Sequence, residues 1–260
     1  MNYKKKILNS FNNGAEQYDS FADIQILAGK LLMKNILNKI GKKSMPNILE
    51  LGSGTGIYTK MLLENLDFKS LLSYDISPKM VNKARRKFNS LNINRLKNNS
   101  KVKFVEQDFD KIDSFEKCNF ITSNMSLHWS IDIFKILDKI FNTSKSGTIF
   151  CFTFPNNKSF KQLEKIRSKA PHKISLNQLP SHEILLKYIK KTQKNIFSEE
   201  IEYFIKFTNV FEFLNKLKVI GVGAKLYNSK NNFFFLRNFK KTFRVSYYIS
   251  CFIVLINERN

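Results

Sequence analysis

The chain has 260 residues and a hydrophobic content of 43%, so it is long and apolar enough for one sizeable folded domain rather than a disordered chain. Its three cysteines are far apart and lack metal-ligand spacing, which suits the cytoplasm, and we expect no bound metal. The longest apolar run, 245–256, is too short to span a membrane, and the first residues do not resemble a signal peptide.

The formal net charge of +23 has two interpretations. Lys, Asn, Phe and Ile are the residues that an AT-rich genome over-uses, so codon usage can account for much of the charge. The distribution is nevertheless uneven, because residues 156–195 contain only two acids, Glu164 and Glu183, and residues 213–257 contain none. Such surfaces suit an acidic partner, either RNA or an acidic carrier protein.

Hydrophobic periodicity predicts helices and strands that alternate along most of the chain. The expected elements are a helix over 22–40, strand 47–51, helix 56–65, strand 70–74, helix 78–88, strands 102–106 and 119–123, helix 131–141, strand 147–154, basic helices over 156–195, strand 199–207, helix 211–217, a loop with a short helix over 228–243, and strand 245–257. This order predicts an α/β fold with a Rossmann-like, seven-stranded, mostly parallel sheet and helices on both faces.

We expect a single domain over residues 1–260 with four parts. They are an N-terminal helical lid over 1–45, a cofactor-binding core over 46–155, a basic helical cap insertion over 156–197, and C-terminal strands that complete the sheet over 198–260. Ligands of such sheets bind at the carboxyl ends of the strands, and every motif below follows a predicted strand.

Residues 48–56, Ile-Leu-Glu-Leu-Gly-Ser-Gly-Thr-Gly, join a strand to a helix through three glycines at alternate positions. Glycines at such a turn let the backbone approach a ligand closely. The spacing differs from the dinucleotide fingerprint G-x-G-x-x-G and favours S-adenosylmethionine, whose cationic methionine end an acid can help hold. The cofactor-binding residues expected here are Glu50, Gly52, Ser53, Gly54 and Gly56.

An acid also follows the second predicted strand. Asp75 lies about 20 residues beyond the glycine loop, where a carboxylate can accept both ribose hydroxyls. The alternative role, an N-cap for the helix at Pro78, is already filled by Ser77. Ile76 and Met80 are expected to flank the adenine, although either could belong to the core.

The third and fourth strands supply the remaining candidates. Asp108 is placed to accept the adenine amino group and Phe109 to lie on the ring. After the fourth strand, Asn124 could hold the amino-acid end of the cofactor, while His128 and Trp129 could line the acceptor side. Trp129 could equally pack in the core, and a single His without an orienting partner is more often structural.

The chain resembles the malonyl-acyl-carrier-protein O-methyltransferases, which are Rossmann-like S-adenosylmethionine-dependent enzymes of biotin synthesis. Residues 10–25, Ser-Phe-Asn-Asn-Gly-Ala-Glu-Gln-Tyr-Asp-Ser-Phe-Ala-Asp-Ile-Gln, are similar to the opening of that family, and residues 123–129 resemble its S-N-x-x-x-Q-W. Pro171-His172 and residues 217–221 and 246–256 also have counterparts, so the resemblance spans nearly the whole chain.

The resemblance implies methylation of the free carboxylate of malonyl-acyl-carrier protein, which masks its charge for elongation towards pimeloyl. It also implies that Tyr18 and Gln25 close over the cofactor, and that the basic cap meets the acidic carrier. His128 stands where the family usually has Gln. The candidates for pairing with the malonyl carboxylate are Arg167, His172 and Lys173, and those for a role beside the reacting atoms are Tyr18, His128 and Trp129.

Two other readings stay open. The same fold could methylate RNA or another small carboxylate, since a fold does not fix its substrate. The chain could also be a non-catalytic assembly factor, although an intact glycine loop with Asp75 disfavours a degenerate pocket. We expect neither a nucleic acid nor a membrane as the main partner.

Overall fold

The computed structural model describes residues 3–41, 44–90, 100–160, 179–220 and 242–257. Seven strands form one sheet in the order β3-β2-β1-β4-β5-β7-β6. The strands are β1 (Asn47–Leu51), β2 (Ser70–Asp75), β3 (Lys101–Glu106), β4 (Phe120–Asn124), β5 (Ile149–Pro155), β6 (Asn195–Phe207) and β7 (Phe243–Leu255). Strands β1 to β5 are parallel, and β7 runs antiparallel to both β5 and β6. The predicted fold class is confirmed.

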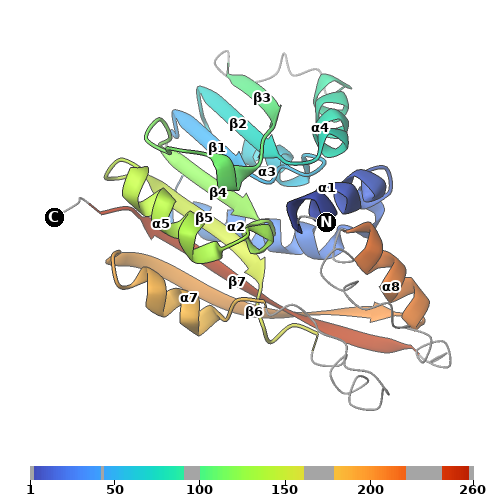
Figure 1. Ribbon diagram of the computed structural model, residues 1–260. Helices are drawn as coiled ribbons and strands as arrows, with labels where there is room; N and C mark the ends of the chain where they lie inside the picture. The colour runs from blue at the N-terminus through green and yellow to red at the C-terminus, as the bar shows by residue number, and fades with distance from the viewer. Residues whose placement is uncertain (1–2, 42–43, 91–99, 161–178, 221–241, 258–260) are drawn as a thin grey trace.

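Helices cover both faces of the sheet (Figure 1). They are α1 (Tyr3–Gly14), α2 (Asp23–Ile40), α3 (Ile57–Asn65), α4 (Pro78–Ser90), α5 (Ile133–Thr143), α7 (His182–Ile189) and α8 (Val210–Val219), with short 3-10 helices η1 (Tyr18–Phe21), η4 (Phe109–Lys111) and η5 (Leu127–Trp129). Buried side chains of α2 and α3 pack on one face, and those of α5 and α7 pack on the other. Burial of these two apolar layers holds the helices to the sheet.

Local sequence explains where several elements begin. Asp132 accepts hydrogen bonds from the backbone N–H of Phe134 and Lys135, at 3.0 and 3.3 Å, so α5 begins at Ile133 rather than at the predicted residue 131. Gly56 has a φ of 83° and is the N-cap of α3, which begins one residue later than predicted.

The C-terminal part differs from the prediction in its boundaries. Strand β6 begins at Asn195 instead of 199, because it pairs with β7 along its whole length, so residues 195–197 belong to the sheet and not to the cap. Strand β7 covers 243–255 rather than 245–257. Within the described part of the cap, α7 is the one helix, and the predicted loop over 228–243 lies almost entirely outside the described residues.

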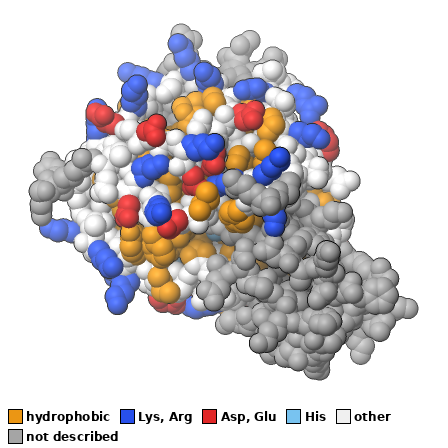
Figure 2. All heavy atoms as spheres, viewed as in Figure 1, with side chains coloured by type: hydrophobic (Ala, Val, Ile, Leu, Met, Phe, Trp, Pro, Cys, Tyr) orange, Lys and Arg blue, Asp and Glu red, His pale blue; other side chains and the backbone are white. Residues whose placement is uncertain are grey.

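None of the helices in the described ranges has both the length and the hydropathy to cross a lipid bilayer. Lys and Arg side chains are spread over the face of the molecule in Figure 2 and do not gather in one patch there.

Candidate cofactor site

The glycine loop follows β1 at the carboxyl edge of the sheet. Gly52, Gly54 and Gly56 all have positive φ, at 84°, 53° and 83°, a region that favours glycine. A Cβ on Gly52 would lie 1.9 Å from the Ser126 hydroxyl oxygen, whereas a Cβ on Gly54 would have its nearest neighbour, the Tyr18 ring, at 3.9 Å. The backbone at Gly52 is therefore held close against the segment after β4, whereas a Cβ on Gly54 would make only an ordinary van der Waals contact with the Tyr18 ring.

Asp75 ends β2 beside this loop. Its two carboxylate oxygens accept hydrogen bonds from the backbone N–H of Gly54 and of Ser77, each at 2.8 Å. Burial raises the pKa of Asp75 to about 6, and these two hydrogen bonds oppose the rise. The Ser77 hydroxyl accepts from the Met80 N–H at 3.2 Å and caps α4. Asp75 is therefore free of the capping role and shapes the glycine loop.

A narrow cavity of about 50 Å³ lies at this edge of the sheet. Its walls come from α1, η1, the glycine loop and the ends of β2, β3 and β4. The lining residues are Lys4, Ile7, Phe11, Tyr18, Gly52, Gly54, Asp75, Ile76, Asp108, Phe109, Asn124, Met125, Ser126 and Trp129. This volume is well below the roughly 300–1,000 Å³ of typical ligand pockets. A larger ligand requires a wall to move outward.

Three of the predicted adenine-side residues, Ile76, Asp108 and Phe109, line this cavity. Asp108 accepts hydrogen bonds from the Asp110 N–H at 3.1 Å and from the Lys4 ammonium at 3.0 Å. Met80 is only 1% exposed and does not line the cavity, in keeping with the alternative that it belongs to the core.

The end of β4 forms the opposite wall. The Asn124 side chain donates to the Gln25 carbonyl at 2.9 Å and accepts from the Thr153 hydroxyl at 2.7 Å, which fixes its orientation. Trp129 lines the cavity and makes an edge-to-face contact with Phe11, with ring centroids 5.3 Å apart. His128 lies behind Trp129, 4.9 Å between centroids, and is not a lining residue.

The N-terminal segment closes the cavity from outside. Tyr18 lines it, and burial together with the Asp75 and Asp19 carboxylates raises the Tyr18 pKa, so this phenol stays protonated. The Gln25 side chain lies beside the Tyr18 hydroxyl. The first helix adds three lining residues that the sequence reading missed, namely Lys4, Ile7 and Phe11. Their spacing of three and four residues, which places them on one helical face, is the signal that could have identified them.

Lys4 ties α1 to the rest of the site. Its ammonium forms ion pairs with Asp108 at 3.0 Å and Asp110 at 2.7 Å, and it lies 4.8 Å from the centroid of the Phe109 ring. Asn12, also on α1, accepts from the Ser77 hydroxyl at 2.7 Å. These polar contacts join α1 to the ends of β2 and β3 and hold it over the cavity.

Three of the predicted loop residues, Glu50, Ser53 and Gly56, do not line the cavity. Ser53 is 5% exposed, and its backbone N–H donates to the Tyr74 carbonyl at 2.8 Å. Glu50 is fully buried, and one carboxylate oxygen accepts from the Thr59 hydroxyl at 2.6 Å and from the Ser73 hydroxyl. Its other oxygen has no hydrogen-bond partner within the described residues.

Replacing Glu50 by Gln is expected to change how stability depends on pH. Burial raises the Glu50 pKa from 4.5 to about 7. The unfolded chain therefore loses this proton before the folded chain does, and stability falls as the pH rises from about 4.5 to about 7. The difference in unfolding free energy, Glu50→Gln minus wild type, should therefore increase by about 2–3 kcal/mol when the pH is raised from 5 to 8.

Urea unfolding of both proteins at pH 5 and pH 8 measures this difference. Because packing changes contribute equally at the two pH values, they cancel in the comparison. An equal difference in unfolding free energy between variant and wild type at both pH values would show that Glu50 is ionised throughout this range.

The predicted substrate-side residues Arg167, His172 and Lys173 lie outside the described residues. Across the part of the chain that the structure describes, no three His, Cys, Asp or Glu side chains come together as metal ligands would.

The residues around the cavity suit S-adenosylmethionine chemically. Gly54 lines the cavity without a side chain, Asp75 offers a carboxylate beside it, and Ile76 and Phe109 offer apolar surfaces. The 3-2-1-4-5-7-6 sheet, with a glycine loop and an acid on neighbouring strands, is the Rossmann-like fold that solved methyltransferase structures share.

Comparison with known proteins agrees with this class. A family model described as a methyltransferase domain matches residues 25–193, more than half of the chain, and the chain belongs to that family. It is accordingly an S-adenosylmethionine-dependent methyltransferase.

Similar curated proteins carry a more specific name. Malonyl-[acyl-carrier protein] O-methyltransferase 1 of Ilyobacter polytropus is 28% identical over 88% of this chain and 81% of its own. The malonyl-[acyl-carrier protein] O-methyltransferase of Acetivibrio thermocellus is 27% identical over 84% of this chain and 79% of its own.

Solved structures share the fold at low sequence identity. Magnesium protoporphyrin IX methyltransferase from Synechocystis PCC 6803 with bound SAH gives a TM-score of 0.60 at 13% identity, covering 97% of this chain and 99% of that one. The YcgJ protein from Bacillus subtilis gives 0.59 at 10% identity, covering 88% and 100%.

Proposed function

We propose that the chain methylates the free carboxylate of malonyl-acyl-carrier protein, giving its methyl ester, as an early cytoplasmic step towards the pimeloyl part of biotin. One observation carries the proposal beyond the methyltransferase class. Residues 10–25, which bear the resemblance to this family, contribute Phe11 and Tyr18 to the cavity wall. Relatives named for this reaction match more than four-fifths of the chain.

The cofactor supplies a methyl group on a positively charged sulfur. Asp75 is proposed to hold the ribose hydroxyls, with Ile76 and Phe109 against the adenine and Asp108 at its amino group. The Asn124 amide has two N–H groups and uses one on the Gln25 carbonyl, which leaves one for the carboxylate of the methionine end.

A malonyl carboxylate suits this site because it is already ionised at neutral pH and needs no general base. The chain then has to align the carboxylate oxygen with the methyl group and exclude water. The edge-to-face pair of Phe11 and Trp129 provides an apolar wall for that purpose. Tyr18, His128 and Trp129 stay candidates for contact with the reacting groups, and Arg167, His172 and Lys173 for pairing with the carboxylate.

The proposal is tested by incubating the protein with S-adenosylmethionine labelled in its methyl group and with malonyl-carrier protein, malonyl-coenzyme A or bulk RNA in parallel. We expect base-labile label on the malonyl-carrier protein. Label that appears in RNA and not in a base-labile ester would overturn the proposal. In cells, expression should restore growth to a biotin auxotroph that lacks this methylation step.

A further inference from the structure

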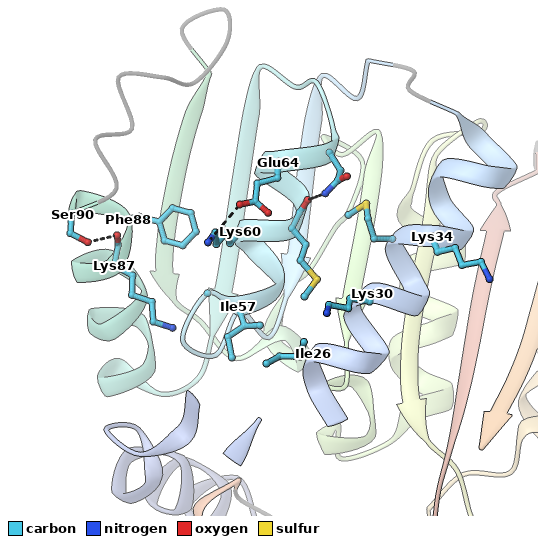
Figure 3. A pocket seen from close by; sticks show the side chains of 13 residues that line it. Ile26, Lys30, Lys34, Ile57, Lys60, Glu64, Lys87, Phe88 and Ser90 are labelled. Atoms are coloured by element: carbon cyan, nitrogen blue, oxygen red, sulfur yellow. Dashed lines mark hydrogen bonds and ion pairs between the residues drawn. The ribbon is translucent and has the colours of Figure 1, made fainter. Parts of the chain in front are cut away.

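A second hollow lies on the face of the sheet that α2, α3 and α4 cover (Figure 3). It has a volume of about 670 Å³, within the range of ligand-binding sites. In Figure 3 the short helix α3 forms its floor, with α2 on one side and α4 on the other. The lining residues are Ile26, Lys30, Met33, Lys34, Gly56, Ile57, Lys60, Met61, Glu64, Asn65, Lys87, Phe88 and Ser90. We call this hollow the α3 groove.

The charged side chains of the α3 groove are predominantly basic. Its four lysines outnumber its single acid, Glu64. Lys30 is exposed, points into the groove, and has no ion pair with the described residues. Lys60 pairs with Glu64 at 3.6 Å, but both side chains are more than half exposed, so this pair is weak and easily exchanged for another acid.

The groove combines this basic rim with an apolar floor. Ile57 and Met61 on α3 and Phe88 on α4 line it between the lysines. A surface with an apolar centre and a rim of one charge recognises an amphipathic helix whose polar edge carries the opposite charge.

The groove also begins next to the cofactor cavity. Gly54 lines the cavity and Gly56 lines the groove, and two residues are at most about 7.6 Å apart along the backbone. The partition between them is η1, where the Tyr18 ring faces the cavity and the adjacent Asp19 pairs with Lys87 of the groove at 2.6 Å. A partner seated here lies beside the reaction site and against the N-terminal wall.

The described part of the basic cap is a weaker candidate for such a partner. Lys158 there is already held by Glu183 at 2.7 Å and Glu200 at 2.8 Å. Lys187, the lysine of α7, is exposed on that short helix.

We propose that the acyl-carrier protein docks in the α3 groove, with an acidic amphipathic helix of the carrier lying along α3. This proposal rests on the proposed function. Its carboxylates replace Glu64 as the partners of Lys60 and engage Lys30, and its apolar face covers Ile57 and Met61. The flexible arm that carries the malonyl group then enters past η1.

The test reverses the charge of the groove with the double substitution Lys30→Glu, Lys60→Glu. Both side chains are exposed and neither lines the cofactor cavity, so the affinity for S-adenosylhomocysteine should stay within twofold of wild type by calorimetry. The matched control, Lys187→Glu with Lys190→Glu, makes the same change in net charge on the exposed face of the described cap. Each protein is assayed with malonyl-carrier protein and with malonyl-pantetheine, which has the same thioester but no carrier.

We expect kcat/KM for malonyl-carrier protein to fall at least tenfold in the groove variant and less than twofold in the control, with malonyl-pantetheine unaffected in both. Unchanged carrier kinetics in the groove variant, or equal losses in both variants, would overturn the docking proposal alone. A wild-type protein that methylates neither substrate would overturn the proposed function, and the docking proposal with it.

Discussion

Replacing Gly52 by Ala is expected to weaken binding of S-adenosylhomocysteine by at least about thirtyfold, equivalent to roughly 2 kcal/mol. The new Cβ would lie 1.9 Å from the Ser126 hydroxyl oxygen and 2.4 Å from the Ser126 Cβ, in a backbone conformation with a φ of 84°. Relief requires the glycine loop to move away from the end of β4. That movement displaces both walls of the cavity. Isothermal titration calorimetry measures the resulting loss of affinity for S-adenosylhomocysteine.

A second glycine provides the control for this variant. Gly147 has a φ of 81°, close to that of Gly52, but a Cβ there would meet no atom within 4 Å. It lies just before β5, at the edge of the sheet opposite the cavity. Gly147→Ala should therefore cost about 1–2 kcal/mol of stability and leave affinity unchanged. Equal affinities of the two variants would show that Gly52 does not shape the site.

Replacing Asp75 by Ala is expected to weaken cofactor binding at least tenfold. The variant loses a charged acceptor for the ribose hydroxyls, and such a hydrogen bond contributes about 1.5–3 kcal/mol. It also loses the hydrogen bond from the Gly54 N–H to Asp75, which helps to order the glycine loop. Because burial raises the Asp75 pKa to about 6, wild-type affinity should be full above that pH and decline below it, as the carboxylate becomes protonated. The variant should not show this pH dependence.

Asp132 is the matched control, since its carboxylate also accepts from two backbone N–H groups. It caps α5 and does not line the cavity. Asp132→Ala should cost about 1 kcal/mol of stability and little affinity. Calorimetry from pH 5 to pH 8 compares the three proteins, and an Asp75→Ala affinity equal to wild type at pH 8 would contradict the ribose assignment.

The sequence predicted the fold class and the parallel core of the sheet, because strand–helix alternation and glycine turns are local signals. It placed strand 70–74 and helix 78–88 within two residues of β2 and α4, where Ser77 supplies a cap. It misplaced the start of β6, because that boundary is fixed by pairing of Asn195 with Leu255 of β7, 60 positions further along the chain.

The site was predictable where residues lie at or just after the end of a strand. Asp75, Asp108 and Asn124 each occupy such a position, and all three line the cavity. The contribution of α1 was not predictable from those motifs, because the path of the chain after α1 brings Lys4 to Asp108, more than one hundred positions away. The same holds for Ser126 beneath Gly52, a contact made by folding and not by spacing. The roles assigned to these residues towards the cofactor stay predictions.

The most direct test of the proposed reaction is the intact mass of malonyl-carrier protein after incubation with the protein and S-adenosylmethionine. We predict the gain of a single methyl group, its loss after mild alkali, and no gain when acetyl-carrier protein, which lacks the free carboxylate, replaces the malonyl form. An unchanged mass of malonyl-carrier protein, with wild-type protein that binds S-adenosylhomocysteine, would contradict malonyl-carrier methylation while leaving the cofactor site intact.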